Sequence, residues 1–515
     1  MGKVIPYGDR KPPGIGHEHT RLGKTQFFGT PYSGKRPTAM TVKTYLSPKG
    51  AAPPGFIEKV KRIVGEENVS EKECDLISYS LDYWLYGVLL SQHGSLPSLP
   101  CAVISPGNRE EIQGILRCAN EYKVHITPFG GGSGVLGGAI PTDGSAILNL
   151  QRMNRFISLD ETSLVAELEA GIIGANLERE LNYRGYSPGN IPQSLYCSTL
   201  GGWISTRAAG QFSTKYGKIE DMVLGMEVVL PDGEFLNIRP VPRRSVGPSL
   251  KDLFLGGEGT LGIVTKAMVS VHPLPEATAK QSFIFRSVGA ALEVVRKILR
   301  GDARPAVVRI FDEAESDRYF PEIGNKVTVI FVSEGEPDFV ELESKVIKRI
   351  AEENDGVPVG EDPANIWLEK RFDIGLGPVI MQQGAVVDTI EVSCLFKDAA
   401  KLYEDMLASM TAIDGSVMVS GHFSHFYPEG ACLYITFAGF PKDQFRYYED
   451  TWTAAMEATL KNNGSISHHH GIGYWRKPFM RKELGDSGVE LLRRIKLAVD
   501  QNGVLNRGKL VDDGR

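Results

Sequence analysis

The chain has 515 residues, of which 42% are hydrophobic and 23% are charged. These proportions exclude a disordered chain, and the length predicts two or three domains. The balance of 57 basic and 63 acidic residues gives a net charge of -6, so no nucleic-acid partner is expected.

Targeting signals and cysteines indicate the compartment. The first residues lack the apolar core of a signal peptide, and no apolar run is long enough to span a bilayer. The six cysteines form no C-x-x-C pair, which favours a reducing compartment. We therefore expect a cytoplasmic protein that contacts membranes at most peripherally.

The predicted elements begin after an arm rich in proline and glycine. Residues 1–95 contain this arm and short helical patterns, and are expected to wrap a larger body. A strand at 102–104 precedes a helix that Asn108 and Glu111 open as an N-cap pair. A second strand at 124–127 leads into a glycine-rich loop.

That loop holds six glycines in the nine positions 130–138. Three of them spell G-x-G-x-x-G, the fingerprint of nicotinamide-binding Rossmann units. A Rossmann fingerprint opens a helix, whereas here a turn and the strand 146–150 follow. We expect the loop amides to hold the pyrophosphate of a nucleotide, since a flexible linker would not be flanked by apolar strands.

The same domain continues to about residue 276. A hairpin at 156–169, a helix at 171–183 and a strand at 223–230 are predicted. Residues 194–210 combine hydroxyls, paired glycines and small side chains, which indicates a surface that contacts a ligand.

Residues 276–465 alternate amphipathic helices with strands, which predicts a second α+β domain. A short strand at 465–470 is expected next. The last helix is expected to start at Ser487 and to bury Leu491, Ile495 and Val499.

Residues 467–477 read S-H-H-H-G-I-G-Y-W-R-K. Adjacent imidazoles are costly to bury without polar partners, so such a cluster indicates a function. Beside two cations, the histidines predict a wall that handles protons or holds an anion. The alternatives are a solvated loop, or a purification tag, which the internal position disfavours.

Together these motifs resemble the flavoproteins of the vanillyl-alcohol oxidase type, or p-cresol methylhydroxylase (PCMH) fold, over residues 96–515. The blocks are P-F-G-G-G-S-G at 128–134, S-T-L-G-G-W-I-S-T-R-A at 198–208 and E-G-T-L-G-I at 258–263. The resemblance implies an α+β fold with a two-subdomain FAD-binding domain and an α+β cap domain built on an antiparallel sheet. The expected boundaries are 1–95 for the arm, 96–276 for the FAD-binding domain, 277–465 for the cap and 466–515 for a segment that returns the histidines to the flavin.

Within that group the chain is most similar to the alkyldihydroxyacetonephosphate synthases. H-H-H-G-I-G at 468–473, G-A-C-L-Y-I-T-F at 430–437, V-P-R-R-S-V-G-P at 241–248 and G-E-D at 360–362 carry this similarity. It implies exchange of the acyl group of acyl-dihydroxyacetone phosphate for a fatty alcohol, through an adduct at flavin N5 and without net oxidation. A lipid-like substrate and a homodimer are expected.

The resemblance also implies a role for individual residues. Tyr434 would move the proton, with His468, His469, His470 and Arg243 as further catalytic residues. Arg371, Arg476 and Lys477 would bind the substrate. The contacts to a non-covalent FAD would come from Pro128, Phe129, Gly130, Gly131, Gly132, Ser133, Gly134, Gln193, Ser194, Ser198, Thr199, Gly201, Gly202, Thr206, Arg207, Ala208, Ala209, Glu258, Gly259, Thr260, Leu261, Gly262, Ile263 and Val264.

Several alternatives stay open. Tyr434 would otherwise be a cross-strand aromatic, and Arg371 a surface cation. FAD-linked 2-hydroxyacid dehydrogenases of the D-lactate and glycolate type share the fold and carry E-H-G-I-G where this chain has H-H-G-I-G. No metal is expected, although His422, His425 and His470 are candidate ligands. A flavin-binding protein without turnover and a module that binds acidic lipid are the non-enzymatic alternatives.

Overall fold

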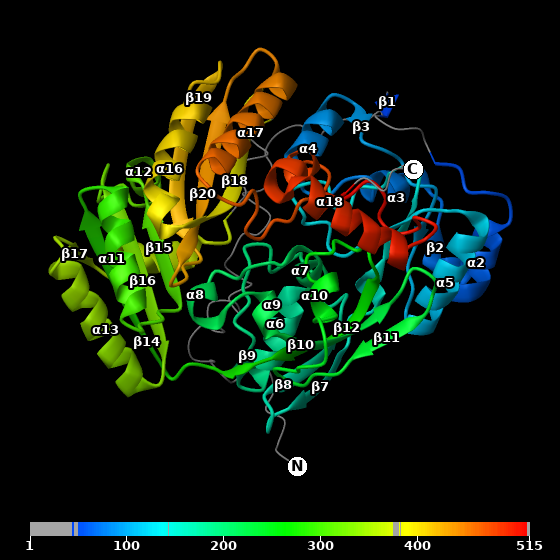
Figure 1. Cartoon of the computed structure of the whole chain (residues 1–515), viewed down its shortest axis with the longest axis horizontal. Helices are drawn as coiled ribbons and strands as arrows, with labels where there is room; N and C mark the ends of the chain where they lie inside the picture. The colour runs from blue at the N-terminus through cyan, green and yellow to red at the C-terminus, as the bar shows by residue number, and fades with distance from the viewer. Residues whose placement is uncertain (1–43, 46–49, 143, 374–380, 382, 512–515) are drawn as a thin grey trace.

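A computed structural model of the chain describes residues 44–45, 50–142, 144–373, 381 and 383–511. Most of the predicted N-terminal arm therefore lies outside the described residues. Figure 1 shows three units of sheet and helix, with the C-terminal helix between the cap and the other two units. Among the described residues, no helix has the length and apolar character that a bilayer crossing requires.

The first unit is a four-stranded sheet with the order β2-β4-β6-β5. Its strands are β2 (Val69–Ser70), β4 (Val103–Ile104), β5 (Ile126–Phe129) and β6 (Ala146–Asn149), and only the β2–β4 pair is antiparallel. Helices α2 (Phe56–Val64) and α5 (Arg109–Tyr122) pack against each other. As predicted, the Asn108 side chain accepts from the Glu111 amide, and the Glu111 carboxylate accepts from the Gly107 amide at 2.7 Å.

The second unit is a five-stranded antiparallel sheet with the order β11-β10-β12-β8-β7. Its strands are β7 (Phe156–Asp160), β8 (Val165–Glu169), β10 (Val223–Val229), β11 (Phe235–Ile238) and β12 (Ile263–Ser270). The helices beside it are α6 (Gly174–Tyr183), α7 (Leu200–Thr206), α8 (Ser213–Tyr216), α9 (Ile219–Met222) and α10 (Lys251–Phe254). The predicted hairpin at 156–169 is β7 and β8.

The cap is a seven-stranded sheet with the order β17-β14-β16-β15-β19-β20-β18, in which every pair is antiparallel. Its strands are β14 (Ala277–Phe285), β15 (Val307–Phe311), β16 (Val327–Gly335), β17 (Val357–Gly360), β18 (Val386–Leu395), β19 (Ser416–Ser424) and β20 (Gly430–Gly439). Its helices are α11 (Val288–Arg300), α12 (Glu313–Tyr319), α13 (Pro337–Glu352), α14 (Asp362–Lys370), α16 (Phe396–Thr411) and α17 (Gln444–Lys461). The expected antiparallel cap sheet is confirmed.

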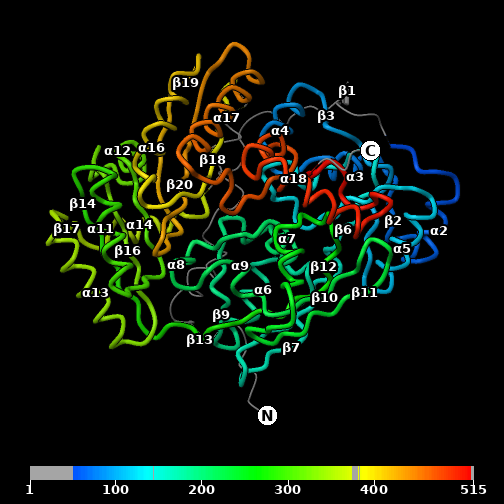
Figure 2. Tube along the Cα trace, in the orientation of Figure 1, coloured from blue at the N-terminus to red at the C-terminus, as the bar shows by residue number. Residues whose placement is uncertain are grey.

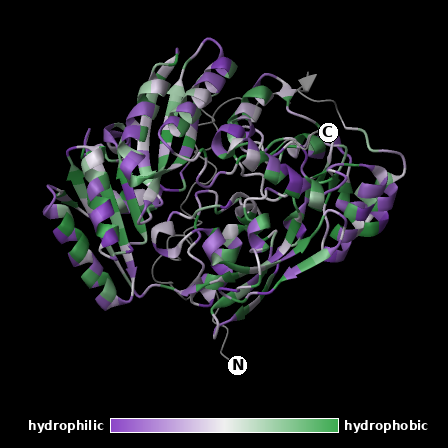
Figure 3. Ribbon diagram, in the orientation of Figure 1, coloured by the Kyte–Doolittle hydropathy of each residue, from purple (hydrophilic) through white to green (hydrophobic). Residues whose placement is uncertain are grey.

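One face of the cap sheet is apolar. Helices α11, α16 and α17 cover that face, where Ile310, Phe423, Leu433, Ile435 and Ile390 are fully or almost fully buried. Figure 3 shows hydrophobic residues along these strands and polar residues on the outer sides of the helices. The opposite face carries polar side chains on β18, β19 and β20, and this part of it forms the site described below.

Helix α18 (Met480–Val499) differs from its prediction. It begins before Ser487 and contains Gly485, which has a left-handed backbone (φ 69°). Leu491 is 59% exposed, and Ile495 and Val499 are half-buried. The buried residue nearby lies on another side of the helix and is Lys496, whose ammonium donates to the carbonyls of Thr260 and Leu505. The periodicity was misleading because a long lysine can bury its stem when the surrounding carbonyls satisfy its charge.

After α18 the chain returns to the first unit (Figure 2). The Ile126 amide donates to the Val504 carbonyl at 2.8 Å, and the Asn506 amide donates back to Ile126. The tail therefore extends the edge of the four-stranded sheet beside the glycine-rich loop.

Candidate active site

The glycine-rich loop lies against the second block of predicted cofactor residues. A β-carbon on Gly131 would collide with the Cys197 carbonyl oxygen, and one on Gly130 with the Thr199 hydroxyl. Gly132 has a φ of +64°, and a β-carbon there would meet the Phe129 ring at 2.5 Å. Close approach to a backbone carbonyl at Gly131, close approach to side chains at Gly130 and Gly132, and the positive φ of Gly132 therefore favour glycine at these positions.

The third block reaches the same place. A β-carbon on Gly259 would collide with the Pro128 ring, and the Asn506 side chain donates to the carbonyls of Gly138 and Glu258. The amides of residues 131–138 donate no hydrogen bond to any described residue. We call this run of open amides, residues 131–138, the glycine cradle. It fits the pyrophosphate of a dinucleotide.

Other predicted cofactor residues have structural contacts. The Ser198 hydroxyl donates to the Ser194 carbonyl and accepts from the Trp203 indole at 2.7 Å. Arg207 donates to the Leu255 carbonyl and lies 3.5 Å from a carboxylate oxygen of Glu220. The Glu258 carboxylate accepts from the amides of Ile472 and Gly473. It therefore joins this domain to residues 465–477, which we call the histidine segment.

The polar face of the cap sheet carries two parallel rows of side chains. In the first row Phe311 is opposite His422, His422 is opposite Tyr434, and Tyr434 is opposite Glu391. Directly opposed residues of antiparallel strands point to the same face, so these side chains share one surface.

The second row lies two residues further along each strand. Ser424 is opposite Cys432, and Cys432 is opposite Ser393. The antiparallel register of Ile310 with Phe423 brings Arg309 opposite Ser424. Side chains two residues apart on a strand share a face, so the second row lies beside the first.

Glu391 on β18 holds the histidine segment in place. Its carboxylate accepts from the amides of His468 and His470 at 2.5 and 2.9 Å and from a guanidinium nitrogen of Arg476 at 2.7 Å. Among the described residues, one isolated β-bridge links this segment to the sheet, between Ser393 and Ser465. The predicted strand at 465–470 is therefore wrong, because a carboxylate takes the amides that a strand would pair.

The imidazoles form a continuous cluster. The ring of His470 contacts the Tyr434 hydroxyl through Nε2 at 2.8 Å, and the ring of His468 contacts the Tyr427 hydroxyl through Nε2 at 2.9 Å. Nδ1 of His468 lies 2.9 Å from Nδ1 of His469. The predicted wall of histidines is thus assembled around Tyr434.

Burial keeps these histidines neutral. It lowers the pKa of His470 to about 4, which Arg476 assists and Glu391 opposes. Burial also lowers the pKa of His468 to about 3 and holds the pKa of His469 well below its ordinary value. Burial alone would raise the pKa of Glu391, but Arg476 and the histidines outweigh it and lower that pKa to about 2.

A second buried carboxylate supports Tyr434 from the other side. Glu315 on α12 lies 3.0 Å from Nδ1 of His422 and accepts from the Thr436 hydroxyl at 3.0 Å. The His422 ring stacks on the Tyr434 ring with centroids 4.9 Å apart and planes 10° apart. Burial and Arg309 lower the pKa of His422 to about 4, so a neutral imidazole donates to an ionised Glu315.

The predicted substrate-binding cations are only partly placed here. Arg476 is fully buried in its ion pair with Glu391, which argues against its predicted contact with substrate. Lys477 lies 5.9 Å from the centre of the Tyr474 ring. Arg371 is buried and donates to the Leu368 carbonyl, and its guanidinium lies 5.9 Å from the Trp367 ring centre.

Arg243 is not brought into the cluster. It lies in residues 241–250, all of which are exposed, and has a left-handed backbone with a φ of 54°. Its predicted catalytic role stays a prediction. Gln193 is exposed as well.

The candidate metal ligands do not come together as a group. His425 pairs with the Ser213 hydroxyl at 2.7 Å, while His422 and His470 pair with Glu315 and Tyr434. Among the described residues, the potential ligand atoms that do lie within 4.8 Å of one another belong to Glu391, Cys432, His468 and His469. Arg476 and two amides already satisfy that carboxylate, so the cluster is explained by internal hydrogen bonds.

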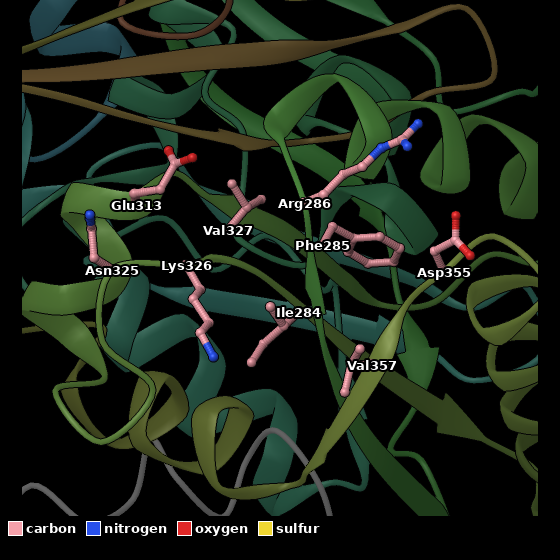
Figure 4. Close-up of a pocket in the computed structure, with 9 residues that line it drawn as sticks. All are labelled: Ile284, Phe285, Arg286, Glu313, Asn325, Lys326, Val327, Asp355 and Val357. Atoms are coloured by element: carbon pink, nitrogen blue, oxygen red, sulfur yellow. The ribbon is translucent and has the colours of Figure 1, made fainter.

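A cavity of about 380 Å³ opens at another part of the cap, near the ends of β14, β16 and β17 (Figure 4). It is lined by Ile284, Phe285, Arg286, Glu313, Asn325, Lys326, Val327, Asp355 and Val357. No predicted site residue lines it.

The most important residues that the sequence analysis missed are Glu391, Glu315 and Arg309. A signal was present for the first, because Thr389, Glu391 and Ser393 alternate with apolar residues along the segment that forms β18. Such a period of two marks a strand with one polar face. The other two have no local signal, since only the sheet register brings them to Tyr434.

Comparison with known families identifies the type of protein. The family described as FAD binding domain matches residues 100–239, and the family described as FAD linked oxidases, C-terminal domain, matches residues 274–510. The chain therefore carries a FAD binding domain followed by a C-terminal domain of the FAD linked oxidase type. FAD is the cofactor of this enzyme, as expected, and the glycine cradle fits it.

Relatives of this FAD-linked enzyme have two kinds of name. The chain is 28% identical over 497 residues to alkyldihydroxyacetonephosphate synthase of Dictyostelium discoideum. The match covers 89% of this chain and 81% of the relative. The chain is 29% identical over 469 residues to glycolate oxidase subunit GlcD of Bacillus subtilis, covering 88% and 96%.

Solved structures confirm the fold. An alkyldihydroxyacetonephosphate synthase superposes with a TM-score of 0.76 at 25% identity, covering 92% of this chain and 90% of that chain. A p-cresol methylhydroxylase superposes with a TM-score of 0.71 at 19% identity, covering 91% and 99%. The PCMH-type fold predicted for this FAD-linked enzyme is therefore correct.

Proposed function

We propose that this FAD-dependent enzyme exchanges the acyl group of an acylated dihydroxyacetone phosphate for a fatty alcohol, forming an ether and releasing a fatty acid. The observation that carries the proposal is the contact of the Tyr434 hydroxyl with Nε2 of a neutral His470. The reaction balances without an oxidant, because the ester carbon–oxygen bond that breaks is replaced by the ether bond that forms.

Bound FAD supplies an electron sink for the carbon beside the carbonyl. The residues supply the proton transfer. Burial raises the pKa of Tyr434, so its hydroxyl is protonated at rest. Nδ1 of His470 makes no hydrogen bond with a described residue but lies 3.7 Å from the ionised Glu391, whose charge favours a proton on Nδ1 and leaves Nε2 to accept from Tyr434.

This geometry lets Tyr434 act in both directions. As its proton passes to His470, the imidazolium would be stabilised by the ionised Glu391, and the phenolate could take a proton from the substrate carbon. The reverse transfer returns the proton later. Support for the proposal also comes from the synthase relative, which matches nearly the whole chain.

The test is turnover with an acyl-dihydroxyacetone phosphate and a long-chain alcohol by the FAD-loaded enzyme. We expect one fatty acid released per ether formed and no consumption of oxygen. Ether formation that requires an added oxidant would contradict the proposal.

A second candidate is oxidation of a 2-hydroxy acid. It is favoured by the glycolate oxidase relative and by His422, which lies beside Tyr434 on the same face of the sheet. Anaerobic addition of D-lactate or glycolate separates the two functions. Bleaching of the flavin absorbance would select the oxidation, whereas the synthase leaves the flavin oxidised at the end of each turnover.

A further inference from the structure

We infer that Arg309, with the hydroxyl of Ser424, forms an oxyanion-binding subsite next to Tyr434 that holds the anionic group of the substrate. The inference deepens the proposed function and rests on it for the identity of that group, which would be the phosphate. A carboxylate is the other source of the same chemistry.

The first observation is that the guanidinium has no hydrogen-bonding partner. Arg309 makes no hydrogen bond or ion pair with any described residue, and its Nε is buried. Its only contacts of note are with rings, at 5.3 Å from the centre of Phe311 and 5.2 Å from that of Trp367. Arg309 is half-buried, and a buried Nε–H normally donates to a carboxylate or a carbonyl, so an unpaired one marks a place for a missing anion.

The second observation is independent. The Ser424 hydroxyl is also buried without a hydrogen-bond partner, and the register of β15 and β19 puts it opposite Arg309 on the polar face. Two unpaired polar groups side by side supply three kinds of donor atom, Nε, Nη and a hydroxyl, that one oxyanion can satisfy together.

The nearest carboxylate does not take the anion's place. Glu315 lies close enough to influence Arg309 but forms no ion pair with it. It is already bonded to His422, Thr436 and Arg318. Burial lowers the pKa of Arg309, and the field of Glu315 offsets this only partly.

Position connects the subsite with the chemistry. Arg309 belongs to the second row of the polar face, and Tyr434 belongs to the first. An anion held by Arg309 would therefore lie along the sheet from the tyrosine, as a phosphate lies a few bonds from the reacting carbon of a small triose ester. Trp367 lies near both Arg309 and Arg371, so the predicted role of Arg371 concerns the same region.

The experiment measures anion binding to the full chain by calorimetry at constant ionic strength. The chain is loaded with FAD, because the cofactor then fills the glycine cradle and the anion cannot bind there. Inorganic phosphate and acetate are titrated separately. We expect Arg309→Gln to weaken the tighter of the two by roughly 10- to 100-fold, Ser424→Ala to weaken it less, and Arg309→Lys to retain part of the affinity. The control is Arg296→Gln on the covered side of the cap, whose guanidinium pairs with Glu293.

The outcomes are distinct. Tighter phosphate assigns the subsite to a phosphate ester, and tighter acetate assigns it to a carboxylate and weakens the proposed synthase activity without harming the inference. Equal affinity of Arg309→Gln and wild type, or no binding of either ion by wild type, would overturn it. Loss of FAD from Arg309→Gln would also overturn it, by assigning the arginine to the cofactor, and FAD absorbance with the thermal midpoint shows whether each variant is folded.

Discussion

Tyr434 depends on its neighbours for any catalytic ability. Its ring stacks on His422 and its hydroxyl contacts His470. His422 is bonded to Glu315, and His470 lies 3.7 Å from Glu391. A buried phenol by itself is a weak acid that rarely gives up its proton, because desolvation disfavours the phenolate. The paired histidines and carboxylates are what make proton transfer possible at this residue.

The first prediction concerns this hydroxyl. Tyr434→Phe should retain FAD and the fold but lose turnover by roughly 100-fold or more, because the acid/base group is gone. Steady-state rates with matched FAD content measure the loss. Tyr447→Phe is the control, since that buried hydroxyl has no hydrogen-bond partner among the described residues; similar losses in both variants would demote Tyr434 to a packing residue.

The second prediction concerns the buried pair of Glu391 and Arg476, both of which are fully buried. Glu391→Gln should lower the free energy of unfolding by about 3–5 kcal/mol, because it leaves a buried guanidinium without a counter-ion. The double variant Glu391→Gln, Arg476→Met should lose less than the sum of the single variants. Urea denaturation measures this cycle.

The matched control for that cycle is the exposed pair of Arg481 and Asp486. Removing either partner there should change the free energy of unfolding by less than about 0.5 kcal/mol. Additive losses at Glu391 and Arg476 would mean that the two charges are not coupled.

At the scale of elements, loops and segments far apart in the sequence are joined by single polar groups. The loop that carries Glu258 binds the amides of the histidine segment, and the C-terminal tail binds β5. Gly471 faces the Glu258 carboxylate so closely that a β-carbon would meet it at 2.6 Å. The histidine segment is therefore positioned by contacts with both domains.

Glu258 gives the third prediction. Burial raises its pKa to about 7 against an ordinary value of 4.5, so the folded state keeps the proton that the unfolded state releases. Its contribution to stability is complete below about pH 4.5 and is lost as the pH rises to 7. Relative to Glu258→Gln, the wild type should lose about 3 kcal/mol over that window.

Denaturation of both proteins at several pH values measures this difference. Glu352→Gln, on the exposed side of α13, is the control and should follow the wild type at every pH. A constant difference between wild type and Glu258→Gln would show that the carboxyl ionises normally.

At the scale of the whole molecule, the predicted cofactor residues come from segments that begin more than 60 positions apart in the chain. Blocks near residues 130, 198 and 259 meet at one cradle, and the tail closes over it. A ligand that contacts all of them links their folding.

The fourth prediction follows from that linkage. Removal of FAD should lower the thermal midpoint, and added FAD should restore it progressively. When the free FAD is 100 times its dissociation constant, binding should raise the free energy of unfolding by about 2.7 kcal/mol. Differential scanning calorimetry over a series of FAD concentrations measures the shift. A midpoint that does not depend on FAD would mean that the cradle contributes nothing to binding.

The sequence by itself determined the family, the cofactor and most of the elements. Glycines that must approach another backbone, caps such as Asn108 with Glu111, and strands with a period of two are local features that each leave a local pattern. The histidine triplet was visible for the same reason, because three adjacent imidazoles are unusual in any fold.

Only the tertiary structure decided which groups work together. Arg476 resembled a free cation in the sequence but is neutralised by Glu391, and the last helix buries Lys496 while the predicted Leu491 is exposed. Arg309 shares a face of the cap sheet with Tyr434 across two strand pairings, a relation that depends on register and leaves no trace in the spacing of residues. The pairing of buried charges is non-local, because it depends on which distant group repays the cost of desolvation.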